Sequence, residues 1–352
     1  MFFVITYHFG CECALARLPF INLFCITSNY DFGNIAVTIF IALSGGLLYK
    51  RYGVIGCEER RPTKSGMTND TQKKTNIFEQ IKAFYVKRAK AIYPPFWLLS
   101  LYIPLSMIQH LLAGDNLFFM GEPFKLLLTA IGFDGYVKLF GVSTYAFCGD
   151  WFVGAIVMLY LLYPLLAKCY RKSPLATLAI LAGLYASQFL IPLEYDDLFS
   201  ALPVTLAFKF CLGFALIENL DRLRDRRIAI VAGAIFLVLT VVNIPGRIKT
   251  DCLGTVAALA LFAAVFYIAP FALRYKAVSI PVQKLATLSY CVFLVQHVGI
   301  VWAQSAFVKM FKKMQWDMSA WTSIALLAVT FFAILAVAGV LKFVSDKIVQ
   351  KF

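Results

Sequence analysis

Charged side chains are scarce in this chain. They make up 15% of its 352 residues, against roughly a quarter in ordinary soluble domains. Hydrophobic residues make up 61%, and the mean hydropathy is +0.77. No polar stretch is long enough to enclose a core of its own, so we exclude a soluble protein and predict one membrane domain covering residues 1–352.

Metal-binding patterns are also missing. The nine cysteines lie mostly within apolar blocks and form no CxxC pair, and the lone CxC of Cys11 and Cys13 offers too few ligands for a metal. We interpret the cysteines as small packing residues and predict no metal. Histidine occurs three times, and one of these residues, His8, stands inside the apolar run that opens the chain, MFFVITYHFG.

Long apolar segments, by contrast, recur along the whole sequence. A helix needs about 20 apolar residues to cross a bilayer, because each residue adds ~1.5 Å across ~30 Å of hydrocarbon. On that basis we predict an all-α polytopic membrane protein with about ten transmembrane helices. These lie near residues 1–12, 34–49, 92–113, 151–167, 175–193, 201–219, 228–245, 252–273, 285–307 and 319–341. The apolar stretch 124–141 contains charges and glycines, and we expect an interfacial or re-entrant helix there.

The net charge of +14 is unevenly distributed between the predicted loops. With both termini cytoplasmic, the inner segments hold 24 of the 33 Lys and Arg residues and only 8 of the 19 Asp and Glu residues. Cytoplasmic loops of membrane proteins carry such an excess of Lys and Arg. The basicity therefore needs no nucleic acid, and membrane lipids are the predicted surroundings.

The longest predicted inner segment, residues 53–91, combines a polar cytoplasmic loop with an amphipathic helix. Apolar residues recur at helical spacing from Ile77 onward, and the helix ends in the basic group Lys87, Arg88 and Lys90. The next span is expected to begin at Tyr93-Pro94-Pro95, since proline is tolerated in a first helical turn. The basic group either anchors the inner face or binds an anionic group such as a phosphate.

Two ionisable residues at membrane depth, His8 and Lys209, are candidate functional residues because such groups are costly there. The alternative for His8 is a packed histidine near the outer interface that hydrogen-bonds a backbone carbonyl. Lys209 has no carboxylate within one helical turn, and its side chain would have to reach about two turns to leave the hydrocarbon. We therefore expect a water-filled cavity or an acidic ligand beside it.

Other candidates each have a structural alternative. Ser44 belongs to an SGG run that equally suits close helix packing. Asp150 and Trp151 begin a span, where an acidic residue also favours the helix dipole. Tyr290 and His297 are seven residues apart and share a helical face, which lines a cavity or forms an interhelical hydrogen-bond pair.

Taken in chain order, five segments resemble the acyltransferase 3 family of membrane-bound O-acyltransferases. They are an early histidine in an apolar run, a span with an LSG ending, a basic stretch before IxP, an outer WF before a Tyr-Pro helix, and a late SYxxFLxxH. In this chain they read YHFG, GNIAVTIFIALSG, FYVKRAKAIYP, DWFVGAIVMLYLLYP and SYCVFLVQH. Ten spans is also the family count, so the resemblance covers nearly the whole chain.

The resemblance implies transfer of an acyl group, commonly acetyl and sometimes succinyl, from cytoplasmic acyl-CoA to a hydroxyl. The acceptor would be a cell-surface polysaccharide or lipid-linked sugar at the plasma membrane. His8 would serve as general base with Asp150 as a second catalytic residue. Acyl-CoA would be bound by Lys87, Arg88, Lys90 and Tyr93, and the substrate cavity would involve Ser44, Trp151, Lys209, Tyr290 and His297.

Two features depart from the family pattern. A basic residue usually stands about ten positions before the histidine, and only seven residues precede His8, so we expect a shortened first helix from a truncated reading frame. The second arginine of the usual RxxR is replaced by Ala91, so Lys87 or Lys90 would have to substitute. Lysine lacks the bidentate fork of arginine.

Two other interpretations stay open at this point. A transporter or flippase of a glycan or lipid-linked precursor would use Lys209 and the histidines along a path, although no internal repeat supports it. A catalytically inactive relative with a structural role in glycan assembly is the other. The acceptor, the choice between acetyl and succinyl, and the oligomeric state are equally open.

Overall fold

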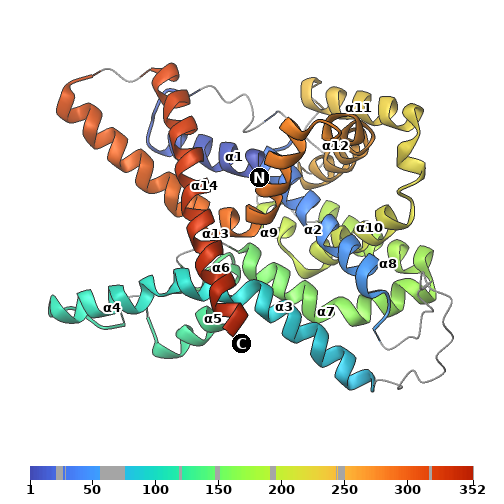
Figure 1. Ribbon diagram of the computed structural model, residues 1–352, viewed down its shortest axis with the longest axis horizontal. Coiled ribbons are helices and arrows are strands. Elements are labelled where there is room, and N and C mark those ends of the chain that lie inside the picture. The colour runs from blue at the N-terminus through green and yellow to red at the C-terminus, as the bar shows by residue number, and fades with distance from the viewer. Residues whose placement is uncertain are drawn as a thin grey trace.

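The structure is a computed structural model that describes residues 1–20, 27, 29–55, 76–118, 121–146, 151–190, 196–242, 244, 250–316 and 319–351. Every regular element within these ranges is a helix (Figure 1), which confirms the all-α prediction. The α-helices are α1 (Phe2–Leu15), α2 (Phe32–Tyr52), α3 (Ile77–Ser100), α4 (Tyr102–Leu112), α5 (Leu126–Ile131), α6 (Asp134–Lys138), α7 (Phe152–Lys172), α8 (Pro174–Ala186), α9 (Asp196–Ser200), α10 (Pro203–Glu218), α11 (Arg226–Val241), α12 (Thr250–Leu273), α13 (Lys276–Met314) and α14 (Ala320–Lys351). Short 3-10 helices are η1 (Pro123–Lys125), η2 (Ser187–Leu190) and η4 (Arg222–Arg224).

Each of the ten predicted spans coincides with helical residues: α1, α2, α3 with α4, α7, α8 with η2, α10, α11, α12, α13 and α14. Six helical stretches of the described chain are long and apolar enough to cross a membrane, which marks an integral membrane protein. They are Phe32–Tyr52, Ile77–Leu112, Phe152–Lys172, Asp251–Leu273, Lys276–Met314 and Ala320–Lys351. Ten spans and cytoplasmic termini stay predictions.

Helix α3 differs from the sequence-based expectation. The amphipathic segment and the following span form one continuous helix from Ile77, and Pro94 and Pro95 lie inside it rather than at a helix start. Each proline removes one main-chain hydrogen bond, but membrane helices tolerate this where neighbouring side chains bond the backbone. The Tyr290 hydroxyl of α13 donates to the Ile92 carbonyl, 3.1 Å away, and so joins this part of α3 to α13. Of the predicted loop before α3, residues 56–75 lie outside the described residues.

The centre of the molecule is the contact between α2 and α10 (Figure 1). A Cβ on Gly213 of α10 would overlap the Ala42 carbonyl oxygen of α2, and one on Gly46 would overlap the Gly213 carbonyl. Small residues therefore bring the two backbones together, as the SGG run indicated for its glycines. Helix α7 packs beside them through Tyr163, whose hydroxyl donates to the Leu48 and Gly53 carbonyls of the α2 end at 3.1 and 2.6 Å.

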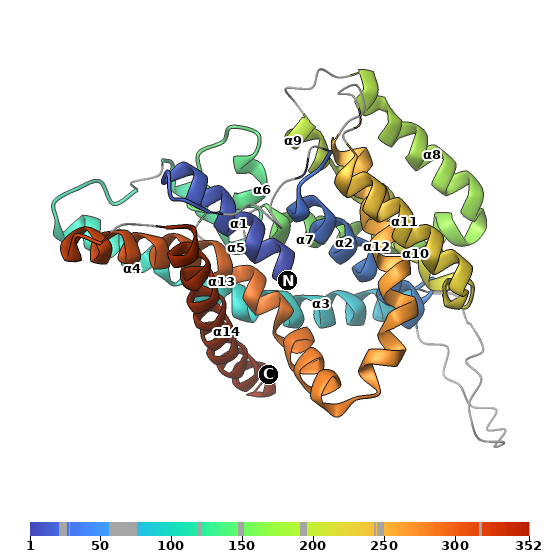
Figure 2. The same cartoon turned by 90° about the horizontal axis from the view of Figure 1, so that it is seen from above.

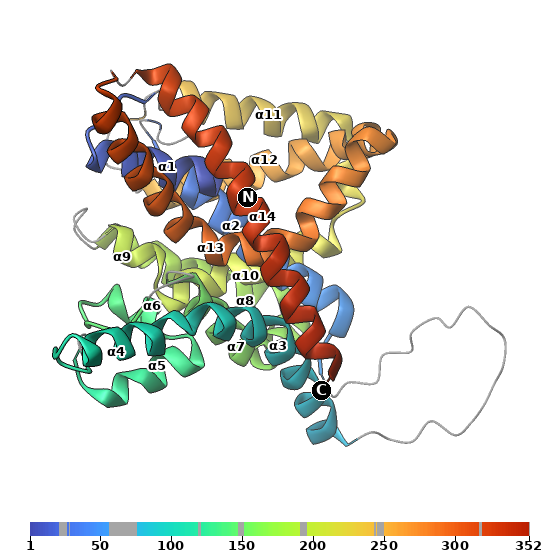
Figure 3. The same ribbon diagram turned by 60° about the vertical axis from the view of Figure 1, so that its left-hand side comes forward.

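Pairs of longer helices surround this centre. Helices α11 and α12 pack against each other, and α14 runs across α13 (Figure 3). Seen from above, α8 and α11 lie toward one end of the molecule and α4 toward the other (Figure 2). The predicted interfacial stretch 124–141 is divided among η1, α5 and α6, because Gly132 adopts a left-handed conformation (φ +78°) that ends α5.

Candidate functional site

His8 lies on α1 at the junction of two hollows. One, the His8 hollow, has a volume of about 240 Å³ and is also lined by Tyr7, Asp31, Lys209 and Asp251, among others. The second, the His297 hollow, has a volume of about 630 Å³ and is lined by His8, Lys138, His297 and Trp302, among others. The His8 and His297 rings meet edge to face with centroids 5.4 Å apart. The structure thus brings together two histidines that are nearly 300 residues apart.

His297 has an unsatisfied nitrogen at this junction. Its Nδ1 is buried and has no hydrogen-bond partner among the described residues. Buried polar atoms are normally paired, so an unpaired one in a hollow is available to a bound molecule or water. Trp151, at the start of α7, lines both hollows. Asp150, predicted as a second catalytic residue, lies outside the described residues.

Lys209 forms a buried ion pair. Its Nζ donates to Asp251 Oδ1 of α12 at 2.6 Å, and the side chains are 2% and 1% exposed. Asp251 also accepts from Asn34 Nδ2 at 2.8 Å and from the Tyr185 hydroxyl at 2.6 Å. The pair lines the His8 hollow. The expected cavity beside Lys209 is therefore present, and its acidic partner is a protein carboxylate.

Arg88 lies beside Tyr160, one of the residues that line a third cavity, the Ser44 hollow. This hollow has a volume of about 220 Å³ and is lined by Ser44, Tyr160 and Tyr290, among others. The Ser44 and Tyr160 hydroxyls are 2.9 Å apart. The Arg88 guanidinium lies 5.9 Å from the Tyr160 ring centroid and 5.7 Å from that of Tyr52, within cation–π range. Its Nε is buried without a hydrogen-bond partner among the described residues.

The other predicted acyl-CoA residues do not join Arg88 at these tyrosines. Lys87 and Lys90 are exposed on α3. Each residue turns an α-helix by about 100°, so side chains that are neighbours in the sequence point in different directions. Tyr93 donates its hydroxyl to the Ile131 carbonyl of α5 at 3.1 Å and stacks on Trp97. The basic group is therefore split between one inward arginine and two exposed lysines.

Two phenylalanines separate the Ser44 hollow from the His8 hollow. Phe152 of α7 and Phe293 of α13 line both cavities, and their ring centroids are 4.5 Å apart. One face of α13 consequently meets all three hollows, through Tyr290, Phe293 and His297 in turn. Arg88 lies beside the Ser44 hollow, through Tyr160, whereas His8 lines the His8 and His297 hollows.

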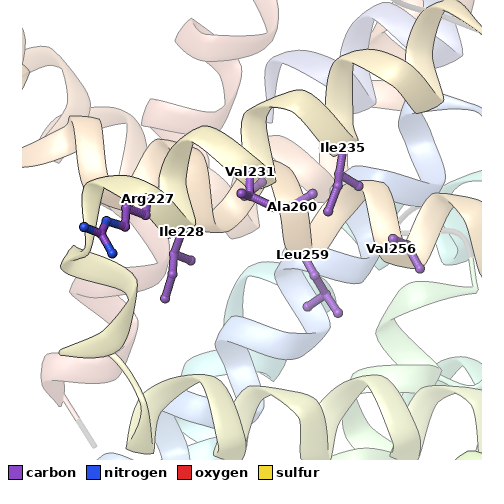
Figure 4. A pocket seen from close by; sticks show the side chains of 8 residues that line it. Arg227, Ile228, Val231, Ile235, Val256, Leu259 and Ala260 are labelled. Carbon is purple, nitrogen blue, oxygen red and sulfur yellow. The ribbon is translucent and has the colours of Figure 1, made fainter.

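A fourth cavity is the groove of about 460 Å³ between α11 and α12 (Figure 4), and it shares no lining residue with the three hollows. Its lining is apolar except for Arg227. None of the predicted site residues contributes to it, so it offers no groups for acid–base chemistry. We assign the candidate site to the Ser44, His8 and His297 hollows.

Sequence reasoning missed Asp251, Asn34 and Phe293. Asp251 stands at the start of an apolar helix and looked like an ordinary outer residue, yet it is the carboxylate that a buried Lys209 requires. That requirement is the signal that could have found it: a lysine at membrane depth needs a charge partner from another helix. Phe293 carried no signal, because the chain contains 33 phenylalanines.

A helical membrane protein with a histidine in one cavity and an arginine beside the adjoining one is compatible with group-transfer chemistry inside the membrane. The family model described as an acyltransferase domain, that of the acyltransferase 3 family, matches residues 1–342. The chain belongs to this family and is a membrane acyltransferase by membership. No curated protein and no solved structure gives a match to the chain.

Proposed function

We propose that this protein is an O-acyltransferase of the plasma membrane. It moves an acetyl group from cytoplasmic acyl-CoA to a hydroxyl of a cell-surface polysaccharide or lipid-linked sugar. One observation carries the proposal: Arg88 lies against Tyr160 of the Ser44 hollow, His8 lines the adjoining hollow, and the two hollows share Phe152 and Phe293 in their lining. A donor held by its phosphates at Arg88 can direct its acyl end toward His8.

The donor side is the basic end of the helices. Lys50 and Arg51 end α2, and Arg171 and Lys172 end α7, so by the positive-inside rule this end of the two helices would face the cytoplasm. Arg88 fits a phosphate, since its Nε has no partner in the described chain. Lys87 and Lys90, exposed on the same helix, add charge for the remaining phosphates.

His8 acts as general base on the acceptor. The imidazole takes the proton of the acceptor hydroxyl as its oxygen attacks the thioester carbonyl carbon, forming the new C–O bond. The C–S bond then breaks, and the CoA thiolate leaves and receives the proton from the imidazolium. His297, 5.4 Å from His8 between ring centroids, Asp150 and Trp151 serve the acceptor side.

The first experiment compares wild type with His8→Ala in nanodiscs, using radiolabelled acetyl-CoA and a glycan extract. Wild type is expected to release CoA and label the glycan, and loss of the base should lower the rate by about 10²–10⁴. His110→Ala is the matched control, because His110 lies on α4 beside Asp115 and lines none of the three hollows. Equal turnover in wild type and a folded His8→Ala would overturn the role of His8. A wild type without turnover would favour the transporter or structural interpretation.

A further inference from the structure

The ammonium group of Lys209 has unused donors in the His8 hollow. It carries three N–H groups, and among the described residues its only partner is Asp251 Oδ1. Two N–H groups of a side chain that is 2% exposed thus find no acceptor in the described part of the protein, although the residue lines a cavity. Buried donors are costly unless something accepts from them. A molecule in the hollow can supply the acceptors.

The network behind Lys209 fixes where those donors lie. Asp251 takes hydrogen bonds from Lys209, Asn34 and Tyr185, so both of its oxygens are engaged. These three partners come from α10, α2 and α8, and together they hold the carboxylate of α12 in place. Lys209 is therefore pre-positioned before any substrate enters, which lowers the entropy lost on binding.

The charge of the hollow favours an uncharged occupant. Its described lining contains two carboxylates, Asp31 and Asp251, against the single ammonium of Lys209. With His8 neutral, as a general base must be, carboxylates are in excess, and an acidic sugar would be repelled. Hydroxyl groups, in contrast, can both accept from Lys209 and donate to Asp31.

The volume of the hollow and its aromatic lining suit one sugar ring. Its volume of about 240 Å³ is below the roughly 300–1,000 Å³ typical of pockets for drug-sized ligands. Tyr7 and Trp151 contribute aromatic side chains to the lining, and such rings offer flat apolar faces beside polar groups.

We propose that the His8 hollow binds a neutral, hydroxyl-rich sugar unit of the acceptor, and that Lys209, held by Asp251, donates hydrogen bonds to its hydroxyl oxygens. The proposal rests on the acyltransferase function above and names the substrate class of that site. Lys209 in this scheme orients the sugar so that one hydroxyl faces His8.

The test is the double variant Lys209→Met with Asp251→Asn. It removes the donors without leaving a lone buried charge, and the formal charge of the hollow stays the same. The KM for the glycan acceptor is expected to rise about tenfold or more, since hydrogen bonds from charged groups are strong, while the KM for acetyl-CoA stays unchanged. Lys342→Met with Asp346→Asn is the control, because it removes a 2.8 Å Lys–Asp pair from α14, outside the three hollows.

Two results would overturn the assignment. An unchanged acceptor KM would make the pair purely structural, and a fall in kcat alone would assign Lys209 to the acyl group instead. If the double variant does not fold while the control does, Lys209→Arg decides, because it keeps the cation and alters the donor geometry. A raised acceptor KM in Lys209→Arg supports the proposal, and an unchanged one overturns it. Absence of turnover in wild type would instead be a failure of the acyltransferase function.

A second readout tests the class of sugar directly. The labelled product is hydrolysed to monosaccharides under conditions that retain the acyl ester, and the sugar that carries the label is identified by mass spectrometry. Label on a neutral sugar is expected. Label mainly on a uronic acid or another acidic sugar would overturn the neutral-acceptor proposal while leaving the acyltransferase function intact.

Discussion

Asp134 shows how one buried carboxyl can set a pH dependence outside the candidate membrane spans. It lies on α6, is 3% exposed, and its pKa is raised above the usual value mainly by burial. The folded state thus binds this proton more tightly than the unfolded state. The stabilisation is complete below the ordinary aspartate pKa of about 3.9 and is lost as pH rises through the raised value. At neutral pH the ionised group opposes folding.

We therefore predict that Asp134→Asn raises the melting temperature of the detergent-solubilised protein at pH 7. The asparagine oxygen can still accept from the Gly135 amide, which is 2.9 Å from Asp134 Oδ1. The difference from wild type should shrink as pH falls and should vanish below about 3, where the aspartate is protonated in both states. Asp221→Asn, at a side chain that is 95% exposed, should show no such gain. A variant less stable than wild type at pH 7 would contradict the burial argument.

At the scale of elements, the packing of α2 on α10 depends on the absence of side chains. A Cβ on Gly213 would overlap the Ala42 carbonyl oxygen, and backbone cannot yield as a flexible side chain can. We predict that Gly213→Ala destabilises the protein by about 1–3 kcal/mol or more, as overpacking does. The measurement is the monodisperse fraction after heating in detergent.

Gly233 of α11 provides the matched control for Gly213. It is also a helical glycine, but a Cβ there would meet nothing within 4 Å. Gly233→Ala should be neutral or more stable by up to about 1 kcal/mol, because alanine has the higher helix propensity. Equal behaviour of the two variants would show that the two backbones are less close than the structure has them.

At the scale of the whole molecule, sequence patterns predicted where helices lie but not how their side chains meet. The length of the apolar segments alone located α2, α7 and α14. The 100° turn per helical residue could also have predicted that Arg88 points in a different direction from Lys87 and Lys90. The partnership of Lys209 with Asp251 joins residues 42 positions apart on different helices. Such contacts depend on tertiary packing, which no local pattern encodes. The continuity of α3 through Pro94 and Pro95 likewise differs from the local pattern, since proline is favoured in a first helical turn.

The arrangement of the three hollows leads to a last prediction, which concerns the size of the acyl group that can be transferred. On the proposed path the acyl end of the donor passes from the Ser44 hollow to the His8 hollow, and Phe152 and Phe293 restrict its size. Phe293→Ala should therefore shift the ratio of propionyl to acetyl turnover upward by about tenfold, the order of magnitude by which a pocket discriminates one methylene. Phe343→Ala, at an α14 residue that is 63% exposed, should leave the ratio unchanged. Competition between the two labelled acyl-CoA donors measures this ratio. An unchanged ratio in a folded, active Phe293→Ala would mean that the acyl group reaches His8 without crossing the phenylalanine partition, and the donor would then have to enter by another side of the His8 hollow.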